Sequence, residues 1–265
     1  MRQANYAAKV NSLADDSTLE LAARLGVSAS VAQVVSTRQL STSIAEVTLQ
    51  GDPSLAGVAG NDIMVRVLDS SGKFIRRRYS VRFVDEDAGT LTLWVTTDHD
   101  GPGCTWARHA QPGDLVDVVG PRGKIILDPD ADWHVFVGDA SGLGAFYRMA
   151  QSIEAPGRAI FIVEIDHDDD ALTASFDEGI GITGIFVDRR GRAKNDPAGL
   201  LNGLAAFEFP QDQGHAYLFG EFSTLRAVRS ALLDRGLDDQ YISSKAFWRA
   251  GRTNADHGEP DKSEN

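Results

Sequence analysis

Three consecutive arginines, Arg76 to Arg78, precede an aromatic residue and a hydroxyl residue, Tyr79 and Ser80. An arginine can bind a pyrophosphate through paired, charge-assisted hydrogen bonds, each contributing about 1.5–3 kcal/mol. A neighbouring tyrosine can cover a flat ring, and a serine can hydrogen-bond a ring nitrogen. Because side chains alternate along a strand, Arg77 and Tyr79 would share one face and could contact one ligand. A basic edge strand that discourages aggregation would carry the same residues, so this segment alone leaves both interpretations open.

Three glycine-rich turns offer further positions for a phosphate-bearing ligand. Residues 101–107, with the sequence GPGCTWA, lead into a helix whose first backbone N–H groups could bind a phosphate. Residues 120–123 (GPRG) are expected to form a tight turn that closes the last strand of the first half. Residues 138–144 (GDASGLG) follow an apolar segment and open a helix, which is the context in which such loops bind dinucleotides. Glycine also serves ordinary turns, so no turn is specific by itself.

The first half of the chain reads as strands. Six short, partly alternating segments rich in β-branched residues are separated by Gly, Pro, Asp and Ser, without a long helix among them. This pattern favours an antiparallel β-barrel. The predicted strands are residues 31–36, 44–50, 62–69, 78–85, 90–97 and 114–120.

The second half alternates strands with helices. Compact apolar segments occupy residues 134–138, 159–165, 184–188 and 216–220. A helical apolar spacing follows the first of them, and another helix follows the last, with Ser223 as its expected N-cap. Strand–helix alternation favours a parallel sheet covered on both faces. We therefore expect an α/β nucleotide-binding domain after the barrel.

The expected domain organisation has four parts. Residues 1–28 form a helical N-terminal extension, residues 29–130 the barrel, residues 131–252 the α/β domain, and residues 253–265 a disordered polar tail. The chain has 265 residues, of which 42% are hydrophobic, which is enough for a substantial core and argues against overall disorder.

Charge and composition exclude several classes of function. A formal net charge of -12 disfavours nucleic-acid binding, which depends on clustered basic residues. A single cysteine, Cys104, excludes an internal disulfide and a cysteine-rich metal site. No apolar segment approaches the roughly 20 residues of a membrane span, and the first residues lack the apolar region of a secretory signal. We expect a cytoplasmic monomer without a resident metal, and we interpret the acidic run at residues 166–170 as a solvated loop.

The order of the motifs resembles that of the siderophore-interacting proteins, which are FAD-dependent ferric-siderophore reductases within the ferredoxin-reductase-like superfamily. The resemblance covers about residues 31–252. It rests on R-x-Y-S at 77–80, G-P-x-x-x-W-A at 101–107, P-G-D at 112–114, G-P-x-G at 120–123, G-D at 138–139, G-E at 220–221 and F-W-R-A-G at 247–251. No single motif is specific, but their shared order makes coincidence improbable.

The resemblance implies an FAD-binding β-barrel followed by a parallel-sheet domain that binds NADH or NADPH. Arg77 would bind the FAD phosphates, while Tyr79 and Ser80 would contact the flavin ring and are the implied catalytic residues. The turn at 101–106 would hold the pyrophosphate, and the loop at 138–145 would line the nicotinamide site. The implied cofactor-binding residues are Arg77, Tyr79, Ser80, Val81, Gly103, Cys104, Thr105, Trp106, Asp139, Ser141, Glu221 and Trp248.

The resemblance also implies the substrate, a ferric siderophore. A nicotinamide donates two electrons as a hydride and ferric iron accepts one, so a flavin would bridge the two. Many ferric siderophores are anions, and an acidic chain needs local positive charge to bind them. Arg66, Arg122 and Arg249 are the expected substrate-binding residues.

Several positions depart from the family pattern. Cys104 takes the place of a serine, Thr97 that of a histidine, and the 138–145 loop lacks the family's glutamate and proline. We interpret His99 as a solvated loop residue and Cys104 as structural, with no base beside it. Two alternatives stay open: a general flavin reductase with another electron acceptor, and a binding protein without turnover.

Overall fold

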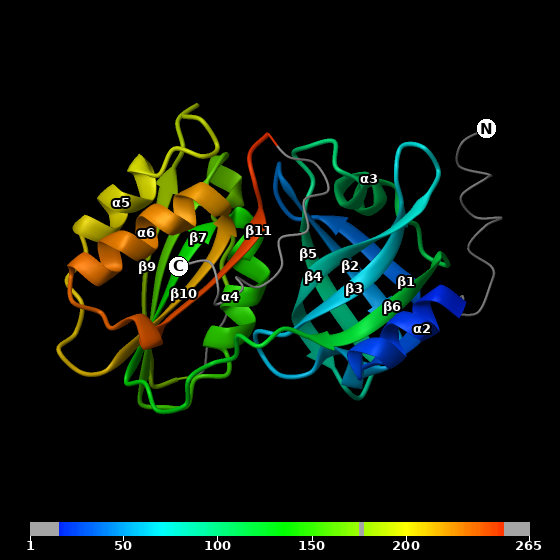
Figure 1. Cartoon of the computed structure of the whole chain (residues 1–265), viewed down its shortest axis with the longest axis horizontal. Helices are drawn as coiled ribbons and strands as arrows, with labels where there is room; N and C mark the ends of the chain where they lie inside the picture. The colour runs from blue at the N-terminus through cyan, green and yellow to red at the C-terminus, as the bar shows by residue number, and fades with distance from the viewer. Residues whose placement is uncertain (1–15, 175–177, 252–265) are drawn as a thin grey trace. The chain divides into compact units, whose positions relative to one another are not determined.

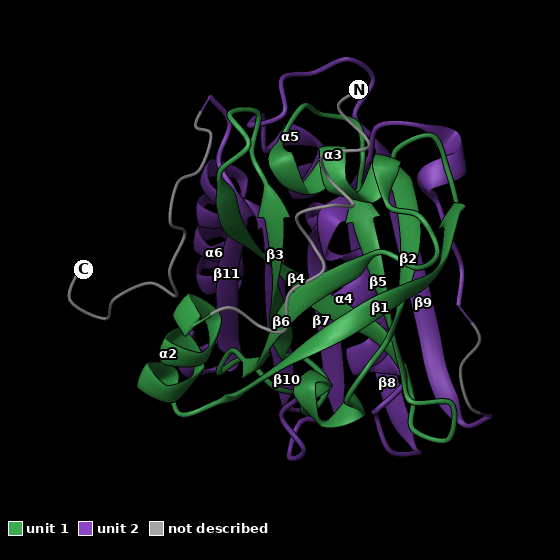
Figure 2. Ribbon diagram, turned by 90° about the vertical axis from the view of Figure 1, so that its right-hand side faces the viewer, with its two compact units in different colours: residues 1–126 green, residues 127–265 purple. Residues whose placement is uncertain are grey.

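The computed structural model describes residues 16–174 and 178–251. It divides the chain into two compact units between Ile126 and Leu127, shown in green and purple in Figure 2. The sequence suggested a boundary at residue 130. Each unit has its own hydrophobic core, which is the mark of a separate domain.

The first unit is a closed antiparallel barrel, as predicted, with the strand order β1-β2-β5-β4-β3-β6. Closure leaves no open sheet edge. Side chains alternate between the two sides of each strand, so that Ile63, Val65 and Val67 of β3 point into the core. The strands are β1 (Ser28–Gln39), β2 (Ile44–Gln50), β3 (Asp62–Leu68), β4 (Phe74–Asp85), β5 (Thr90–Thr96) and β6 (Leu115–Arg122).

In the described residues of this unit, two α-helices and one short 3-10 helix, η1 (Pro53–Ala56), accompany the barrel (Figure 1). Helix α2 (Asp16–Leu25) packs Ala22 against Met64 and Val119 on the outer side of the barrel. This helix covers ten residues of the predicted N-terminal extension, whose residues 1–15 lie outside the described part, as does the predicted tail. Helix α3 (Pro102–His109) joins β5 to β6 and contributes Trp106 to the barrel core.

The second unit is a parallel five-stranded sheet with the order β11-β10-β7-β8-β9, which confirms the predicted α/β domain. Helices α5 and α6 pack on one face, where Leu200 and Leu225 meet Val135. On the other face, Phe146 of α4 stacks on Phe219 and packs against Phe136 at a tilted angle. The strands are β7 (Trp133–Asp139), β8 (Gly157–Ile165), β9 (Ile180–Asp188), β10 (Gly214–Glu221) and β11 (Ile242–Trp248). The helices are α4 (Leu143–Ala150), α5 (Ala198–Ala205) and α6 (Phe222–Asp234), with the 3-10 segments η2 (Ala140–Gly142), η3 (Asp168–Asp170) and η4 (Asp239–Tyr241).

Three local features of the second unit differ from the sequence-based expectation. Helix α5 and strand β11 had not been predicted as elements. The N-cap of α6 is Glu221 and not Ser223, because the Glu221 carboxylate accepts a hydrogen bond from the backbone N–H of Thr224 at 2.9 Å. A carboxylate at this position also suits the positive end of the helix dipole.

Candidate functional site

The fold gives the three arginines of β4 different partners. Arg78 forms two hydrogen bonds to the buried carboxylate of Asp62, at 2.9 and 2.7 Å. Arg76 donates to the hydroxyls of Ser17 and Thr18 on α2, both at 3.1 Å. Arg77 donates to the carbonyl of Arg76 at 2.8 Å. Burial lowers the pKa of Arg77, while Tyr79 and Asp69 oppose that shift; the guanidinium nevertheless keeps its charge. The sequence offered no means of separating these roles, because the partners of Arg76 and Arg78 lie far away along the chain.

Arg77 and Tyr79 lie together at the start of α3. A Cβ atom on Gly103 would overlap the Tyr79 hydroxyl and would lie 3.6 Å from Cγ of Arg77, so only glycine permits this approach. The rings of Tyr79 and Trp106 are 5.5 Å apart. The structure therefore brings together four of the residues that the sequence assigned to one cofactor.

The start of α3 has the features of a phosphate-binding turn. Gly101 is the N-cap and provides no side-chain hydrogen bond, while Pro102 occupies the first turn. The first N–H groups of a helix lack intrahelical acceptors and favour an anion. Within residues 16–174 and 178–251, the buried indole Nε1 of Trp106 has no hydrogen-bond acceptor. A glycine-dependent approach, an uncapped helix start and a buried donor fit a flavin nucleotide bound by this unit.

Other predicted cofactor residues are placed differently. Ser80 is half-buried on β4, and Thr105 is exposed on α3. The side chain of Val81 lies in the barrel core at 1% exposure, so it does not face a ligand. The prediction for Val81 can hold only for its backbone.

Cys104 has a histidine beside it, contrary to the sequence-based expectation. Its Sγ lies 2.9 Å from Nε2 of His99 and 2.7 Å from the carbonyl oxygen of Thr96. Nδ1 of His99 accepts a hydrogen bond from the backbone N–H of Gly101 at 3.0 Å. These contacts define a neutral imidazole that donates through Nε2 to a thiol, which donates to Thr96. His99 is exposed, but it is a bonded part of the α3 start and not an unattached loop residue.

The two candidate substrate arginines of the first unit differ in their surroundings. Arg66 forms an ion pair with Asp117 at 2.8 Å, and its guanidinium lies 3.9 Å from the centre of the Phe74 ring. Arg122 contacts the Met64 sulfur at 3.9 Å, which is a weak acceptor. The charge of Arg66 is therefore compensated locally, whereas Arg122 forms no ion pair among the residues the structure describes.

Asp139, at the carboxyl end of β7, is surrounded by hydrogen-bond donors. Its Oδ1 accepts from the backbone N–H and the hydroxyl of Ser141, and its Oδ2 accepts from the Glu221 N–H at 2.9 Å and the Trp248 Nε1 at 3.0 Å. Burial raises the pKa of Asp139, while the bonds from Ser141 and the charge of Arg189 oppose that shift. The structure thus joins the predicted residues Asp139, Ser141, Glu221 and Trp248 in one cluster.

Glu221, at the carboxyl end of β10, is equally enclosed at 1% exposure. Besides capping α6 through Oε2, it accepts a hydrogen bond from the Ala250 N–H through Oε1 at 3.1 Å. Arg249 lies in the sequence between Trp248 and Ala250, and its guanidinium is 4.6 Å from the centre of the Phe222 ring.

A buried ion-pair network at the ends of β8 and β9 was missed by sequence reasoning. Arg189, 3% exposed, bonds Glu164 at 2.9 Å and Asp166 at 2.6 Å. Arg192 bonds the other oxygen of Glu164 at 2.8 Å. Asp166 and the fully buried Asp170 are therefore structural, which corrects the view of residues 166–170 as a solvated loop at these two positions, while His167, Asp168 and Asp169 are exposed as predicted. The sequence signal that could have indicated this network is the pair of acidic residues, Glu164 and Asp166, at the end of a strand.

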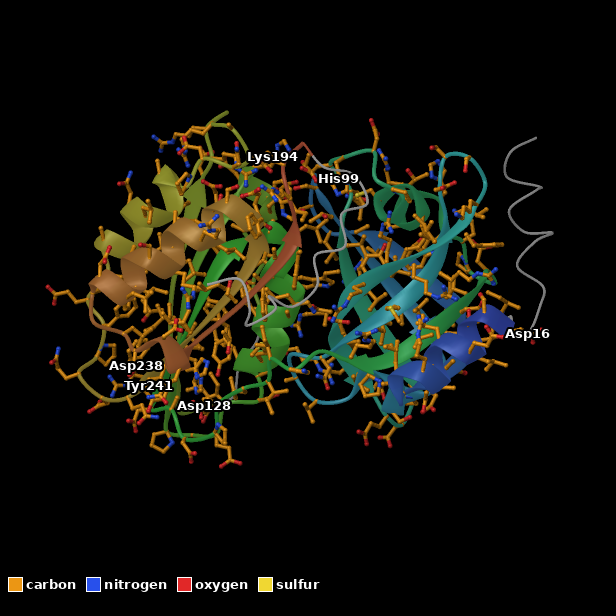
Figure 3. The ribbon with its side chains drawn as sticks, in the orientation of Figure 1. Asp16, His99, Asp128, Lys194, Asp238 and Tyr241 are labelled. Atoms are coloured by element: carbon orange, nitrogen blue, oxygen red, sulfur yellow. The ribbon has the colours of Figure 1, made fainter. Side chains whose placement is uncertain are left out.

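A second polar cluster lies at the amino end of the same sheet, opposite the end marked by Lys194 in Figure 3. His215 bonds Asp128 at 2.9 Å and Ser243 at 3.0 Å, and it stacks on Tyr217. Burial, with the charge of His215, lowers the pKa of His134 to about 4. Nucleotides bind parallel sheets at the carboxyl end, so this amino-end cluster is not the expected nucleotide site.

The described part of the chain offers neither a candidate metal site nor a candidate membrane span. No group of three or more His, Cys, Asp or Glu residues there could hold a metal ion. No helix there is long and apolar enough to cross a membrane.

A barrel followed by a parallel sheet defines a ferredoxin-reductase-like fold. The ferredoxin-NADP+ reductase of Plasmodium falciparum shares it, with a TM-score of 0.66 and 11% identity over 82% of this chain and 95% of that one. The profile of the siderophore-interacting FAD-binding domain matches residues 59–125, and that of the siderophore-interacting protein matches residues 131–251. The chain belongs to the siderophore-interacting protein family.

Two relatives illustrate the family. The chain resembles a siderophore utilization protein from T. fusca, with a TM-score of 0.76 and 27% identity over 87% of this chain and 96% of that one. It is 25% identical to the ferric vibriobactin reductase ViuB of Vibrio cholerae over 71% of this chain and 69% of that protein. The matches span about two thirds of the length of its curated relatives.

Proposed function

We propose that this protein binds FAD in its barrel unit and passes electrons from NADH or NADPH to the ferric iron of a siderophore. The observation that carries the proposal is the meeting of Arg77, Tyr79, Gly103 and Trp106 at the start of α3. These residues belong to a segment that matches an FAD-binding domain. A curated relative is a ferric vibriobactin reductase, which supports the choice of iron as the electron acceptor.

Each residue of this group has a distinct role in the proposal. The Arg77 guanidinium binds the cofactor phosphates, and the uncapped backbone N–H groups at the start of α3 complete that contact. Tyr79 covers the flavin ring, while the Ser80 hydroxyl bonds a ring nitrogen. Trp106 supports the tyrosine from the core side. When bound, FAD supplies the ability to accept electrons in pairs and to release them singly.

The nicotinamide cofactor is assigned to the carboxyl end of the sheet in the second unit. Open parallel sheets bind nucleotides there, beside a glycine-rich turn that opens a helix. The turn here runs from Gly138 through Ser141 into α4, and Ser141 provides a hydroxyl at its start. Glu164, the acidic residue at the end of the next strand, is already paired with Arg189 and Arg192. That pairing gives no preference between a ribose hydroxyl and a ribose phosphate, so either donor fits the proposal.

The proposed substrate contacts are electrostatic. Arg122 and Arg249 offer positive charge to an anionic ferric complex on a chain whose formal net charge is -12. Arg66 was grouped with them from the sequence, and we propose a smaller effect for it because Asp117 compensates its charge. One-electron reduction releases the iron, since ferrous iron binds the oxygen donors of siderophores more weakly than ferric iron does.

A chelator that traps ferrous iron tests this proposal in steady state. Purified protein is supplied with FAD, with NADH or NADPH, and with the ferric complex of 2,3-dihydroxybenzoate as an anionic substrate. We expect ferrous iron to appear, with a higher KM in Arg122→Ala than in wild type and a smaller rise in Arg66→Ala. Added salt should raise the wild-type KM more than that of Arg122→Ala, because exposed charges are screened over about 8 Å at physiological ionic strength.

Acceptors without iron separate the alternatives. Turnover with an uncharged quinone but not with the ferric complex would indicate a general flavin reductase. FAD binding without turnover for any acceptor would indicate a binding protein.

A further inference from the structure

The Asp139 carboxylate already has a full set of hydrogen bonds within the second unit. A carboxylate has about four acceptor positions, and Asp139 receives four donors from Ser141, Glu221 and Trp248. Its side chain is 7% exposed. A Cβ atom on Gly220 would lie 2.5 Å from Oδ2, so the glycine before Glu221 is what allows β10 to approach the carboxylate. A direct contact with a nucleotide would displace one of these donors.

The Glu221 carboxylate is occupied in the same way. One oxygen caps α6 at Thr224, and the other accepts the N–H of Ala250. The backbone N–H of Glu221 in turn binds Asp139. The two carboxylates therefore form a continuous chain of hydrogen bonds from β7 through β10 to the residues that follow β11.

This series of hydrogen bonds ends at the two sequence neighbours of Arg249. Trp248, the residue before it, is bound through its indole to Asp139, and Ala250, the residue after it, is bound through its backbone to Glu221. The ring of Phe222, which follows Glu221 directly, lies below the guanidinium. Among the described residues Arg249 forms no ion pair. The position of its guanidinium therefore depends on this framework and not on a carboxylate partner.

We propose that Asp139 and Glu221 are positioning residues that fix the segment Trp248–Ala250 and thereby place Arg249 for the anionic ferric substrate. They do so in place of contacting a cofactor, which the family resemblance had implied for both. The proposal rests on the proposed function for its substrate, but the hydrogen-bonded framework itself can be tested without it.

Epistasis tests whether Asp139 acts through Arg249. In Asp139→Asn one of the two acceptor oxygens becomes an amide nitrogen, which cannot accept, so the side chain can no longer satisfy the donors of Ser141, Glu221 and Trp248 together. Trp248→Phe removes only the indole donor and guards against misfolding of the first variant. We expect both to raise the KM for ferric 2,3-dihydroxybenzoate by about fivefold while kcat and flavin reduction by the nicotinamide stay unchanged. Asp139→Asn should add no further increase in an Arg249→Ala background. Asp170→Asn, another buried carboxylate in this unit, is the matched control and should leave KM unchanged.

Additive KM effects of Asp139→Asn and Arg249→Ala would overturn the proposal. A raised KM for NADH or NADPH, or slower flavin reduction, would return Asp139 to the nicotinamide site and overturn it as well.

Amide hydrogen exchange gives a readout that needs no substrate. Exchange of the Glu221 amide should accelerate in Asp139→Asn, and exchange of the Ala250 amide in Glu221→Gln. Unchanged exchange rates would contradict the framework. If exchange accelerates in these variants but the wild-type protein fails to reduce the ferric complex, the framework is supported and the proposed function is rejected.

Discussion

Arg76, Arg77 and Arg78 look alike in the sequence, and their partners separate them in the fold. Arg78 compensates the buried Asp62, whose side chain is 2% exposed, and Arg76 joins α2 to β4. These two roles are structural. Arg77 is left beside Tyr79 and Gly103 with its charge partly desolvated, which is the setting in which an arginine binds phosphate strongly.

The first prediction separates binding from stability among these arginines. Arg77→Ala should lose most of its FAD and unfold in urea like wild type. Arg78→Ala should still bind FAD, because it keeps the proposed FAD-binding residues. Its free energy of unfolding should fall by about 3 kcal/mol, because a buried carboxylate is left uncompensated. Flavin content after gel filtration and urea unfolding of the FAD-free protein measure the two effects. Full flavin occupancy in Arg77→Ala would contradict the assignment.

A second residue-scale prediction concerns Cys104. The thiol donates to Thr96 and receives a bond from a neutral His99, so it is held as a buried hydrogen-bonding group and not as a nucleophilic thiolate. Cys104→Ser keeps both bonds and should bind FAD at least as well as wild type, with unchanged turnover. Loss of turnover with FAD still bound would show that the thiol has a chemical role.

At the scale of elements, α3 and β4 form the proposed flavin site by close approach. Gly103 allows that approach, and the motif order had placed it on the phosphate turn without showing what it contacts. Packing of this kind depends on the path of the backbone, which periodicity does not reveal. Sequence reasoning succeeded for the barrel strands, whose β-branched residues recur between turns, and for β7, β8 and β10, which are apolar runs. It missed β11, where Ser243, Ser244 and Lys245 interrupt the apolar pattern.

Gly103→Ala tests this approach. The added methyl group overlaps the Tyr79 hydroxyl and must move either the ring or the start of α3. We expect the FAD dissociation constant to rise by about tenfold or more, which corresponds to about 1.4 kcal/mol. Gly181→Ala on β9 is the matched control, because its Cβ would lie 3.4 Å from the Arg158 side chain, in ordinary van der Waals contact, and because Gly181 belongs to the other unit. Fluorescence titration with FAD that gives equal affinities for both variants would remove Gly103 from the site.

Three ion pairs with a buried partner join positions that no local sequence pattern connects, and this limits prediction from the sequence. Asp62 with Arg78, Asp117 with Arg66, and Glu164 with Arg189 are each separated by many residues. Their effect on the molecule is to compensate charges that composition alone counts as net acidity. The motif order nevertheless supplied the candidate site residues, and the fold separates those that meet at the start of α3 from those held in ion pairs within the structure.

At the scale of the whole molecule, the buried His134 makes stability depend on pH. Its pKa in the folded protein is about 4 against an ordinary value of 6.5, because burial disfavours the charged ring. Below pH 6.5 the unfolded chain takes up this proton first, so stability falls as the pH decreases toward 4. The full effect is about 3 kcal/mol. His134→Phe should show a shallower loss of unfolding free energy from pH 7 to pH 4.5 than wild type, measured by urea unfolding. Parallel pH curves for the two proteins would contradict this origin.

The central claim is that one protein accepts electrons from a nicotinamide and delivers them to chelated ferric iron through bound FAD. The most direct test is an anaerobic titration of FAD-loaded protein, followed by its flavin absorbance. We predict that NADH or NADPH bleaches the flavin bands. Subsequent addition of ferric 2,3-dihydroxybenzoate should restore them and release about two ferrous ions per flavin, as the electron count requires. A flavin that stays oxidised with both nicotinamides, or a reduced flavin that the ferric complex fails to reoxidise, would contradict the account.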